Sequence, residues 1–190
     1  NVEENELPKI IQKIQNGELD GVNITIPHKE TIMQHLDEIN PRAKSIGAVN
    51  CIIKSDSKII GNNTDWYGFS MTLKNKDINL IGKDIIVLGA GGSAKSILYA
   101  LRQMDVQKIF LLNRSIEKAQ VLQNEYIVSY SLNDAEKIIK PDSIIINTTS
   151  MGMQSEQSPL DLRLLHENQI LIDVIYTPLE TAFLKFGKKI

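Results

Sequence analysis

A short apolar run followed at once by a glycine-rich loop is the feature that most constrains the fold of this chain. The run Ile85–Leu88 contains only large apolar residues, which is typical of a parallel strand buried on both faces of a sheet. The loop that follows it consists of Gly89, Ala90, Gly91, Gly92 and Ser93. Helical periodicity begins near Ala94, so the order strand, glycine loop, helix predicts a dinucleotide-binding unit.

Each position of this loop has a physical reason in such a unit. Gly89 would allow a tight turn, and Gly91 would let the backbone approach a pyrophosphate. The main-chain N–H groups and the positive end of the helix would then hold the anion. The alternative is a glycine-rich turn without a ligand, which the placement between a strand and a helix disfavours.

The segments after the loop continue the alternation of strands and helices. A helical pattern starts near Ile116, and apolar runs predict strands at Ile109–Leu112, Ile144–Ile146 and Ile170–Ile172. This alternation predicts a Rossmann-type, doubly wound nucleotide-binding domain.

The first third of the chain predicts a smaller α/β domain. Helical spacing is expected from Leu7 to Ile14, and a second helix near Glu30–Ile39, ending before Pro41. Strands are expected at Val22–Ile26, Ala48–Ile53 and Lys58–Ile60. We therefore predict an α/β protein of two domains, with residues 1–66 as the substrate domain and residues 67–178 as the cofactor domain.

Composition excludes several other classes of protein. A formal net charge of −2 leaves no excess of Lys and Arg to neutralise the phosphates of a nucleic acid. No apolar run reaches the roughly 20 residues that span a bilayer, and the acidic start resembles no signal peptide. The three histidines lack ligand spacing, so we expect no metal site. The single cysteine suits a reducing cytoplasm, where we expect the protein.

The end of the strand after the glycine loop indicates which dinucleotide binds. NAD sites usually place Asp or Glu there, about 20 residues beyond the glycines, to hold the ribose hydroxyls. Here the strand ends in Asn113, Arg114 and Ser115, with Lys118 nearby. A guanidinium can bind a 2′-phosphate through two hydrogen bonds, which favours NADP over NAD. The alternative is an ordinary arginine facing solvent.

Three polar segments of the first domain are candidates for the reaction centre. Lys29 follows a strand and a proline turn at the expected start of a helix, where a cation is unfavourable by roughly 0.3–1 kcal/mol. Asp65 ends a polar turn, and Asn50 begins a strand. Taken singly, these residues could equally be a solvated lysine, a helix cap and a turn asparagine.

Taken together, these motifs resemble the shikimate dehydrogenase family. The resemblance rests on segments that occur in the family's order over nearly the whole chain: Asn23–Lys29, Gly47–Asn50, Asn63–Gly68, Gly89–Ser93, Asn113–Ser115, Asn147–Met153 and Asp173–Pro178. It implies reversible, NADPH-dependent reduction of 3-dehydroshikimate to shikimate, on the route to chorismate and the aromatic amino acids. It also implies a monomer or homodimer with no partner beyond these small molecules.

The resemblance assigns roles residue by residue. It implies that Lys29 is the catalytic group and that Asp65 is its partner. The residues that would contact the substrate are Thr25, Asn50, Asp65 and Tyr176. The residues that would hold the cofactor are Gly89–Ser93, Asn113, Arg114, Ser115 and Lys118, with Val174 near the nicotinamide. Cys51 stands where the family usually has threonine, and we interpret it as structural.

The family has two elements that this sequence does not contain. The resemblance implies a strand with a serine-containing substrate motif before residue 1, and a segment with a substrate-binding glutamine after the helix that residues 179–190 begin. We therefore expect the substrate domain of this sequence to be incomplete and these 190 residues alone to lack shikimate oxidation.

Three alternatives stay open at this stage. One is a quinate/shikimate dehydrogenase of broader specificity, often NAD-using, against which Asn113 and Arg114 speak. Another is a non-catalytic sensor of the same fold that binds pathway metabolites, which the presence of Lys29 and Asp65 disfavours. The third is an inactive product that binds only the cofactor.

Overall fold

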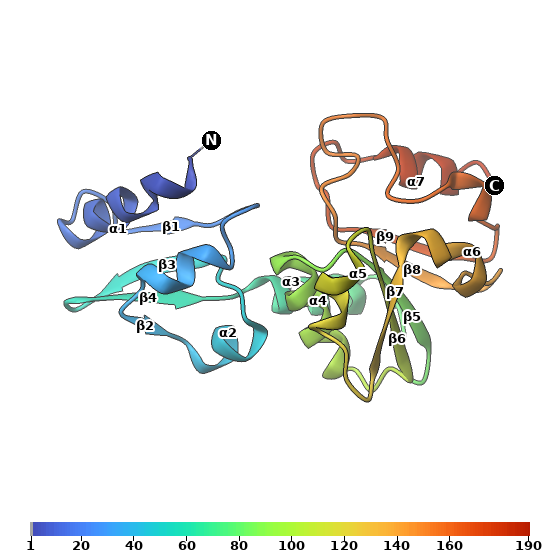
Figure 1. The fold of residues 1–190 in the computed structure, drawn as a ribbon, viewed down its shortest axis with the longest axis horizontal. Helices are drawn as coiled ribbons and strands as arrows, with labels where there is room; N and C mark the ends of the chain where they lie inside the picture. The colour runs from blue at the N-terminus through green and yellow to red at the C-terminus, as the bar shows by residue number, and fades with distance from the viewer. Residues whose placement is uncertain (1) are drawn as a thin grey trace. The chain divides into compact units, whose positions relative to one another are not determined.

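The computed structural model describes residues 2–190, which divide into two compact units, each with a sheet of its own (Figure 1). The first unit runs to Asp77 and includes Lys95–Ala100, and the second contains Ile78–Ala94 and Leu101–Ile190. The predicted α/β fold class is confirmed. The finer division at residues 66 and 178 stays a prediction.

The first unit has a four-stranded sheet in the order β1-β3-β4-β2. Its strands are β1 (Gly21–Asn23), β2 (Glu38–Ile39), β3 (Cys51–Ser55) and β4 (Lys58–Asn62). Strands β3 and β4 form the predicted hairpin, in which Cys51 lies opposite Asn62. Strand β1 pairs with β3 and ends at Asn23, so the rest of the predicted strand, as far as Ile26, belongs to the following turn.

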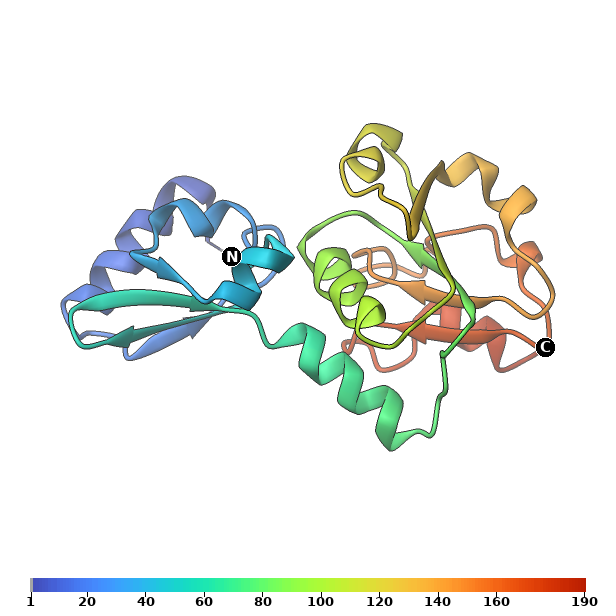
Figure 2. The same cartoon turned by 90° about the horizontal axis from the view of Figure 1, so that it is seen from below.

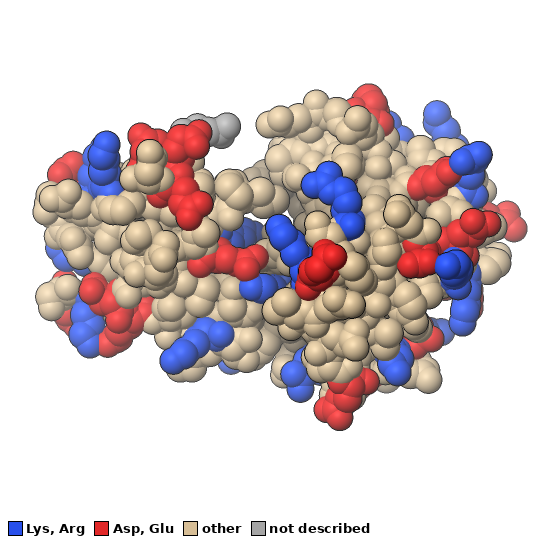
Figure 3. All heavy atoms as spheres, viewed as in Figure 1, with Lys and Arg blue, Asp and Glu red and all other residues tan. Residues whose placement is uncertain are grey.

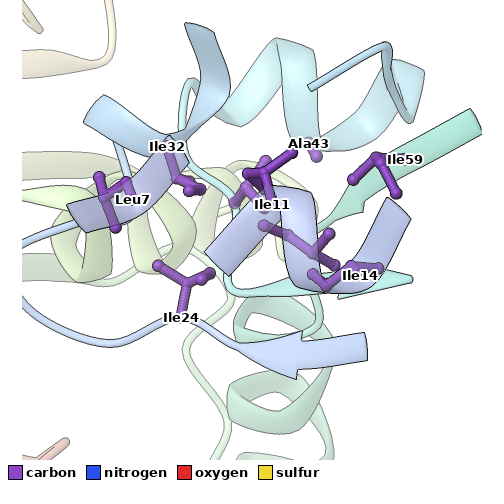
Figure 4. Close-up of a cluster of buried hydrophobic side chains, with 9 residues drawn as sticks. Leu7, Ile11, Ile14, Ile24, Ile32, Ala43 and Ile59 are labelled. Atoms are coloured by element: carbon purple, nitrogen blue, oxygen red, sulfur yellow. The ribbon is translucent and has the colours of Figure 1, made fainter. Parts of the chain in front are cut away.

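Five helical segments accompany this sheet. They are η1 (Glu4–Glu6), α1 (Leu7–Gln15), η2 (Thr31–His35), α2 (Pro41–Ile46) and α3 (Asp65–Asn75). The predicted helix from Leu7 to Ile14 is confirmed: Leu7, Ile11 and Ile14 share one face because they lie four and three residues apart. Figure 4 shows these three side chains gathered with those of Ile24, Ile32, Ala43 and Ile59 in the core of the unit.

The predicted helix at Glu30–Ile39 is wrong. The chain forms only η2 there, and Glu38 and Ile39 then pair in parallel with Ile60 and Gly61 of β4. Backbone pairing begins one residue earlier, where Asp37 N donates to Ile59 O at 3.1 Å. Helical spacing of apolar residues fits this segment, but pairing with the edge of the sheet determines its conformation. Pro41 begins α2, which is the first helical position that proline favours.

The second unit has a five-stranded, wholly parallel sheet in the order β7-β6-β5-β8-β9 (Figure 2). Its strands are β5 (Asp84–Leu88), β6 (Lys108–Asn113), β7 (Ile127–Ser131), β8 (Ile144–Asn147) and β9 (Ile170–Asp173). The strand order turns back between β5 and β8, as in doubly wound nucleotide-binding folds. The predicted Rossmann-type unit is confirmed, although β7 was not among the predicted strands.

Helices follow the strands of this sheet. They are α4 (Gly92–Arg102), α5 (Ile116–Gln120), η3 (Leu132–Asp134), α6 (Ala135–Ile138), η4 (Leu162–Leu164) and α7 (Ala182–Gly187). One of them, α4, has its residues Lys95–Ala100 in the first unit. One face of the sheet packs Ile86, Leu88 and Ile145 against α6, η4 and the fully buried Phe183 of α7. On the opposite face Ile85 and Val87 are also fully buried, as the all-apolar run predicts.

The surface fits the low net charge. Basic and acidic side chains are interspersed over the face that Figure 3 shows, in keeping with the formal net charge of −2. Across residues 2–190, no helix is both long enough and apolar enough to cross a membrane.

Candidate functional site

The segment after β1 is held in place by backbone hydrogen bonds to the segment before β3. Ile24 N donates to Asn50 O at 2.8 Å, and Val49 N donates to Lys29 O at 2.7 Å. Between these two bonds His28 N donates to Thr25 O at 2.9 Å and closes a turn that contains the cis peptide bond before Pro27. Lys29 is therefore anchored through its own carbonyl.

The segment that carries Asp65 leaves the neighbouring strand. Strand β4 ends at Asn62, which accepts a hydrogen bond from Asn50 N at 3.0 Å through its carbonyl. Asp65 is the first residue of α3. Thr64 precedes the helix, but its side chain does not cap it, and Asn63 Oδ1 accepts from Asp65 N at 3.1 Å instead.

These segments bring Lys29, Asp65 and Asn50 together. Lys29 Nζ donates to Asp65 Oδ2 at 2.7 Å, and Asn50 Nδ2 donates to Asp65 Oδ1 at 2.6 Å. Each carboxylate oxygen thus accepts from a different donor. Asn50 Oδ1 also accepts from Thr64 N at 2.9 Å, which fixes the orientation of the Asn50 amide.

The Lys29–Asp65 ion pair is only partly accessible to solvent. The exposed fraction is 13% for the Lys29 side chain and 30% for that of Asp65. An ammonium and a carboxylate at this distance form a charge-assisted hydrogen bond, which is shorter and stronger than a neutral one. The pair can hold or transfer a proton at an oxygen placed beside Nζ.

The other two predicted substrate residues are both exposed. Thr25 is an exposed residue of the turn that leads to Lys29. Tyr176 belongs to the second unit, where its side chain is 76% exposed.

The glycine loop begins in the second unit where β5 ends. Gly89 has a φ of 105°, in the range that side chains rarely adopt, and a Cβ there would come within 2.8 Å of Thr148 Oγ1. Thr148 Oγ1 is itself held at 2.6 Å from Leu88 O, to which it donates. A Cβ added to Gly91, by contrast, would meet nothing within 4 Å. The fold therefore explains glycine at position 89 and leaves open space at position 91.

The predicted 2′-phosphate residues follow β6. Asn113 is the last residue of that strand, and its Nδ2 donates to Ser115 O at 2.8 Å. Arg114 and Lys118 are both exposed, and Lys118 N donates to Ser115 O at 3.2 Å. Two cationic side chains thus stand beside a tightened turn at the carboxyl end of a parallel strand.

Sequence reasoning assigned no role to a polar network at the ends of β8 and β9. Asp173 Oδ1 accepts from Asn147 Nδ2 at 3.1 Å and from Ile175 N at 3.0 Å, and Asp173 Oδ2 accepts from Thr181 Oγ1 at 2.7 Å. Val174 N donates to Asn147 O at 3.1 Å, so this network also fixes Val174. The sequence offered one signal for this network: Asn147 and Asp173 each directly follow an apolar run.

A metal centre has no candidate in the described part of the chain. Among residues 2–190, no group of three or more His, Cys, Asp or Glu side chains lies together in a way that could hold a metal ion.

Comparison with known proteins gives matches over nearly the whole chain. Residues 1–52 match the family described as shikimate dehydrogenase substrate binding domain, and residues 71–173 match the family described as shikimate / quinate 5-dehydrogenase. The NADP(+) shikimate dehydrogenase of Clostridium beijerinckii is 40% identical over 98% of this chain and 69% of its own length. That of Geobacillus kaustophilus is 43% identical over 88% of this chain and 63% of its own length.

Solved structures of shikimate dehydrogenases also match this chain over nearly its whole length. Shikimate dehydrogenase 1 of Peptoclostridium difficile has a TM-score of 0.90 at 33% identity and covers 100% of this chain and 70% of its own. The Thermus thermophilus enzyme in complex with NADP(H) and shikimate has a TM-score of 0.82 at 33% identity, over 99% of this chain and 70% of its own. The chain thus spans 69% and 63% of the lengths of the two sequence relatives.

The two glycines of the loop should respond differently to alanine. Gly89→Ala should lower the free energy of unfolding by about 1–3 kcal/mol, because the new Cβ meets a disfavoured φ and the held Thr148 hydroxyl. Gly91→Ala should leave it unchanged within about 0.5 kcal/mol. Urea unfolding of both variants measures the difference, and equal stability of the two would contradict the geometry.

Proposed function

The chain belongs to the shikimate dehydrogenase family, and we propose that it carries the NADP-dependent interconversion of shikimate and 3-dehydroshikimate. The observation that carries the proposal is the Lys29–Asp65 ion pair, with 2.7 Å between Lys29 Nζ and Asp65 Oδ2 and with Asn50 on the second carboxylate oxygen. The names of the Clostridium and Geobacillus relatives support the same activity.

The residues of the pair fit reduction of a ketone. When bound, NADPH supplies the hydride that adds to a carbonyl carbon. The oxygen of that carbonyl then develops negative charge and needs a proton or a cation close by. The Lys29 ammonium supplies both, and Asp65 holds Nζ in position. In the reverse direction neutral Lys29 accepts the proton of the substrate hydroxyl.

The remaining predicted substrate contacts suit a molecule with several hydroxyls and a carboxylate. We assign hydroxyl contacts to Thr25, Asn50 and Asp65, whose side chains offer donors and acceptors. We assign a further contact to Tyr176, whose phenol is available because the side chain is 76% exposed. These four assignments rest on the family resemblance together with the polar character of the residues.

The residues of the second unit fit a phosphorylated dinucleotide. The open space at Gly91 supports a role for its backbone beside the pyrophosphate, with Gly89, Ala90, Gly92 and Ser93 completing the loop. We assign the 2′-phosphate to Arg114 and Lys118, with Asn113 and Ser115 shaping their turn. Val174, fixed through Asn147, would flank the nicotinamide.

A monomer or homodimer in the cytoplasm fits this activity. The reaction needs only the two small molecules, and the single cysteine of these 190 residues, Cys51, suits a reducing compartment. Size-exclusion chromatography with light scattering distinguishes the two states of assembly.

A quinate/shikimate dehydrogenase of broader specificity is the second candidate. The family that matches residues 71–173 is described by both substrates, which favours testing both. Turnover of quinate at a rate comparable to that of shikimate would establish the broader activity.

Gly91→Ala in the full chain should weaken NADPH binding at least tenfold without changing stability. The added methyl group would occupy the open space that we assign to the pyrophosphate, whereas it meets no protein atom within 4 Å. Titration of NADPH fluorescence measures the dissociation constant. An unchanged constant would remove the glycine loop from the cofactor site.

Arg114→Ala should raise the Michaelis constant for NADP about 10- to 150-fold and leave that for NAD nearly unchanged. A charge-assisted hydrogen bond to a phosphate contributes roughly 1.5–3 kcal/mol, and NAD has no 2′-phosphate. Arg163→Ala, which removes an exposed arginine of the same unit, is the matched control. An equal loss with both cofactors would refute the assignment.

Lys29→Ala should lower kcat by about 10²–10⁴-fold and leave the affinity for NADPH intact, because the variant loses the proton donor and not the cofactor site. Lys58→Ala is the control, since Lys58 forms an exposed ion pair with Glu38 in the same unit. Asp65→Asn should also be severe and non-additive with Lys29→Ala. Near-normal turnover of Lys29→Ala would make the lysine a surface residue.

A further inference from the structure

The side-chain amide of Asn63 is buried and joins the start of α3 to two other segments of the chain. Its exposed fraction is 2%. Its Oδ1 accepts from Asp65 N at 3.1 Å, and its Nδ2 donates to Ala48 O at 2.9 Å and to Ser96 Oγ at 2.9 Å. Both amide hydrogens of Nδ2 are therefore used, and the buried side chain is satisfied.

The bond from Asp65 N sets the start of helix α3. The first N–H groups of a helix have no partner within the helix, and a side chain must usually accept from them. Thr64, which occupies the capping position, makes no such bond with its side chain. Asn63 does so from one residue further back, so the backbone that carries the Asp65 carboxylate depends on this amide.

The bond from Asn63 Nδ2 to Ala48 O holds the segment that carries Asn50, the second residue that donates to the Asp65 carboxylate. Ala48 is fully buried and lies two residues before Asn50, which donates to Asp65 Oδ1 at 2.6 Å. The bond to Ser96, which is also fully buried, ties the amide to Lys95–Ala100, the part of helix α4 that belongs to the first unit. One side chain thus holds the backbone of Asp65 and the segment that presents Asn50.

We infer that Asn63 is a positioning residue, which fixes the Asp65 carboxylate against Lys29 Nζ through the backbone of α3 and the segment that leads to Asn50. The inference rests on the proposed function, in which that pair carries the proton transfer. Asn63 is too deeply buried to contact substrate, so its effect must act through Asp65.

Kinetics of the full chain test the inference. Asn63→Ala should lower kcat for shikimate oxidation 10- to 100-fold and leave the dissociation constant for NADPH within twofold. Asp65→Asn should then lower kcat much less in the Asn63→Ala background than in the parent, because both changes disable the same group. A kcat within twofold of the parent, or multiplicative effects of the two changes, would overturn the inference.

Two further variants separate positioning from general stability. Asn40→Ala is the matched control, because Asn40 Oδ1 caps α2 by accepting from Arg42 N at 3.0 Å. It should lower the stability and leave kcat unchanged. Asn63→Ser keeps a side-chain oxygen that can accept from Asp65 N–H. This variant keeps the inference testable if the alanine variant does not fold. It should restore part of kcat, and a serine variant with no more activity than the alanine variant would count against the inference.

Hydrogen exchange at the Asp65 amide separates this inference from the proposed function. If the full-length parent protein shows no shikimate-dependent reduction of NADP, the proposed function fails. The amide of Asp65 should still be protected in the parent and exchange at least tenfold faster in Asn63→Ala, while Asn40→Ala leaves it protected. Equal exchange in the parent and in Asn63→Ala would overturn the role of Asn63, whatever the activity.

Discussion

The register of the β3–β4 hairpin determines where the polar groups around Lys29 lie. Because Cys51 pairs with Asn62, Asn50 and Asn63 lie one residue beyond the paired strands, where side chains are free to bond across the hairpin. Asn50 N continues the ladder to Asn62 O, and Ile24 N joins it through Asn50 O. A slip of one residue would turn these side chains to the other face of the sheet and separate the Asp65 carboxylate from its donors.

In the second unit, the register of the parallel strands determines where the loops that follow them begin. Leu88, Leu112 and Asn147 pair in one row across β5, β6 and β8, and Asp173 extends that row on β9. The loops that leave these strands therefore emerge at one edge, which is where ligands bind in open parallel sheets. The glycine loop, Arg114 and Val174 each follow a strand of this row. Our cofactor assignments thus share one geometric origin.

The strongest local patterns were sufficient to predict much of the fold. The apolar run at β5 with its glycine loop and the Leu7–Ile14 helix owe their form to local chemistry, and both were predicted. Strand β2 was missed because its two residues are defined by pairing with β4, and the spacing of their neighbours favours a helix. Strand β7 was also missed; it lies at the edge of the sheet and pairs only with β6.

The site was harder to predict because its contacts join distant residues. Lys29 and Asp65 are 36 residues apart, so only the family resemblance placed them together, and nothing local distinguishes them from a solvated lysine and a helix cap. The role that we infer for Asn63 could not be predicted locally, because its Nδ2 donates to residues 15 and 33 positions away. Pairings of this kind follow from the tertiary fold and not from periodicity.

The different burial of the asparagine amides and of the Lys29–Asp65 pair has a physical reason. Burying a lone charge costs far more than burying an amide that forms all its hydrogen bonds. Asn63 and Asn147 are 2% and 0% exposed, and their uncharged amides hold the backbone N–H of Asp65 and the carboxylate of Asp173. The Lys29–Asp65 pair, with 13% and 30% exposure, is less buried than these amides, which suits the proton transfer that we propose. Buried uncharged groups therefore hold the segments in place, and the charged pair keeps part of its surface open to solvent.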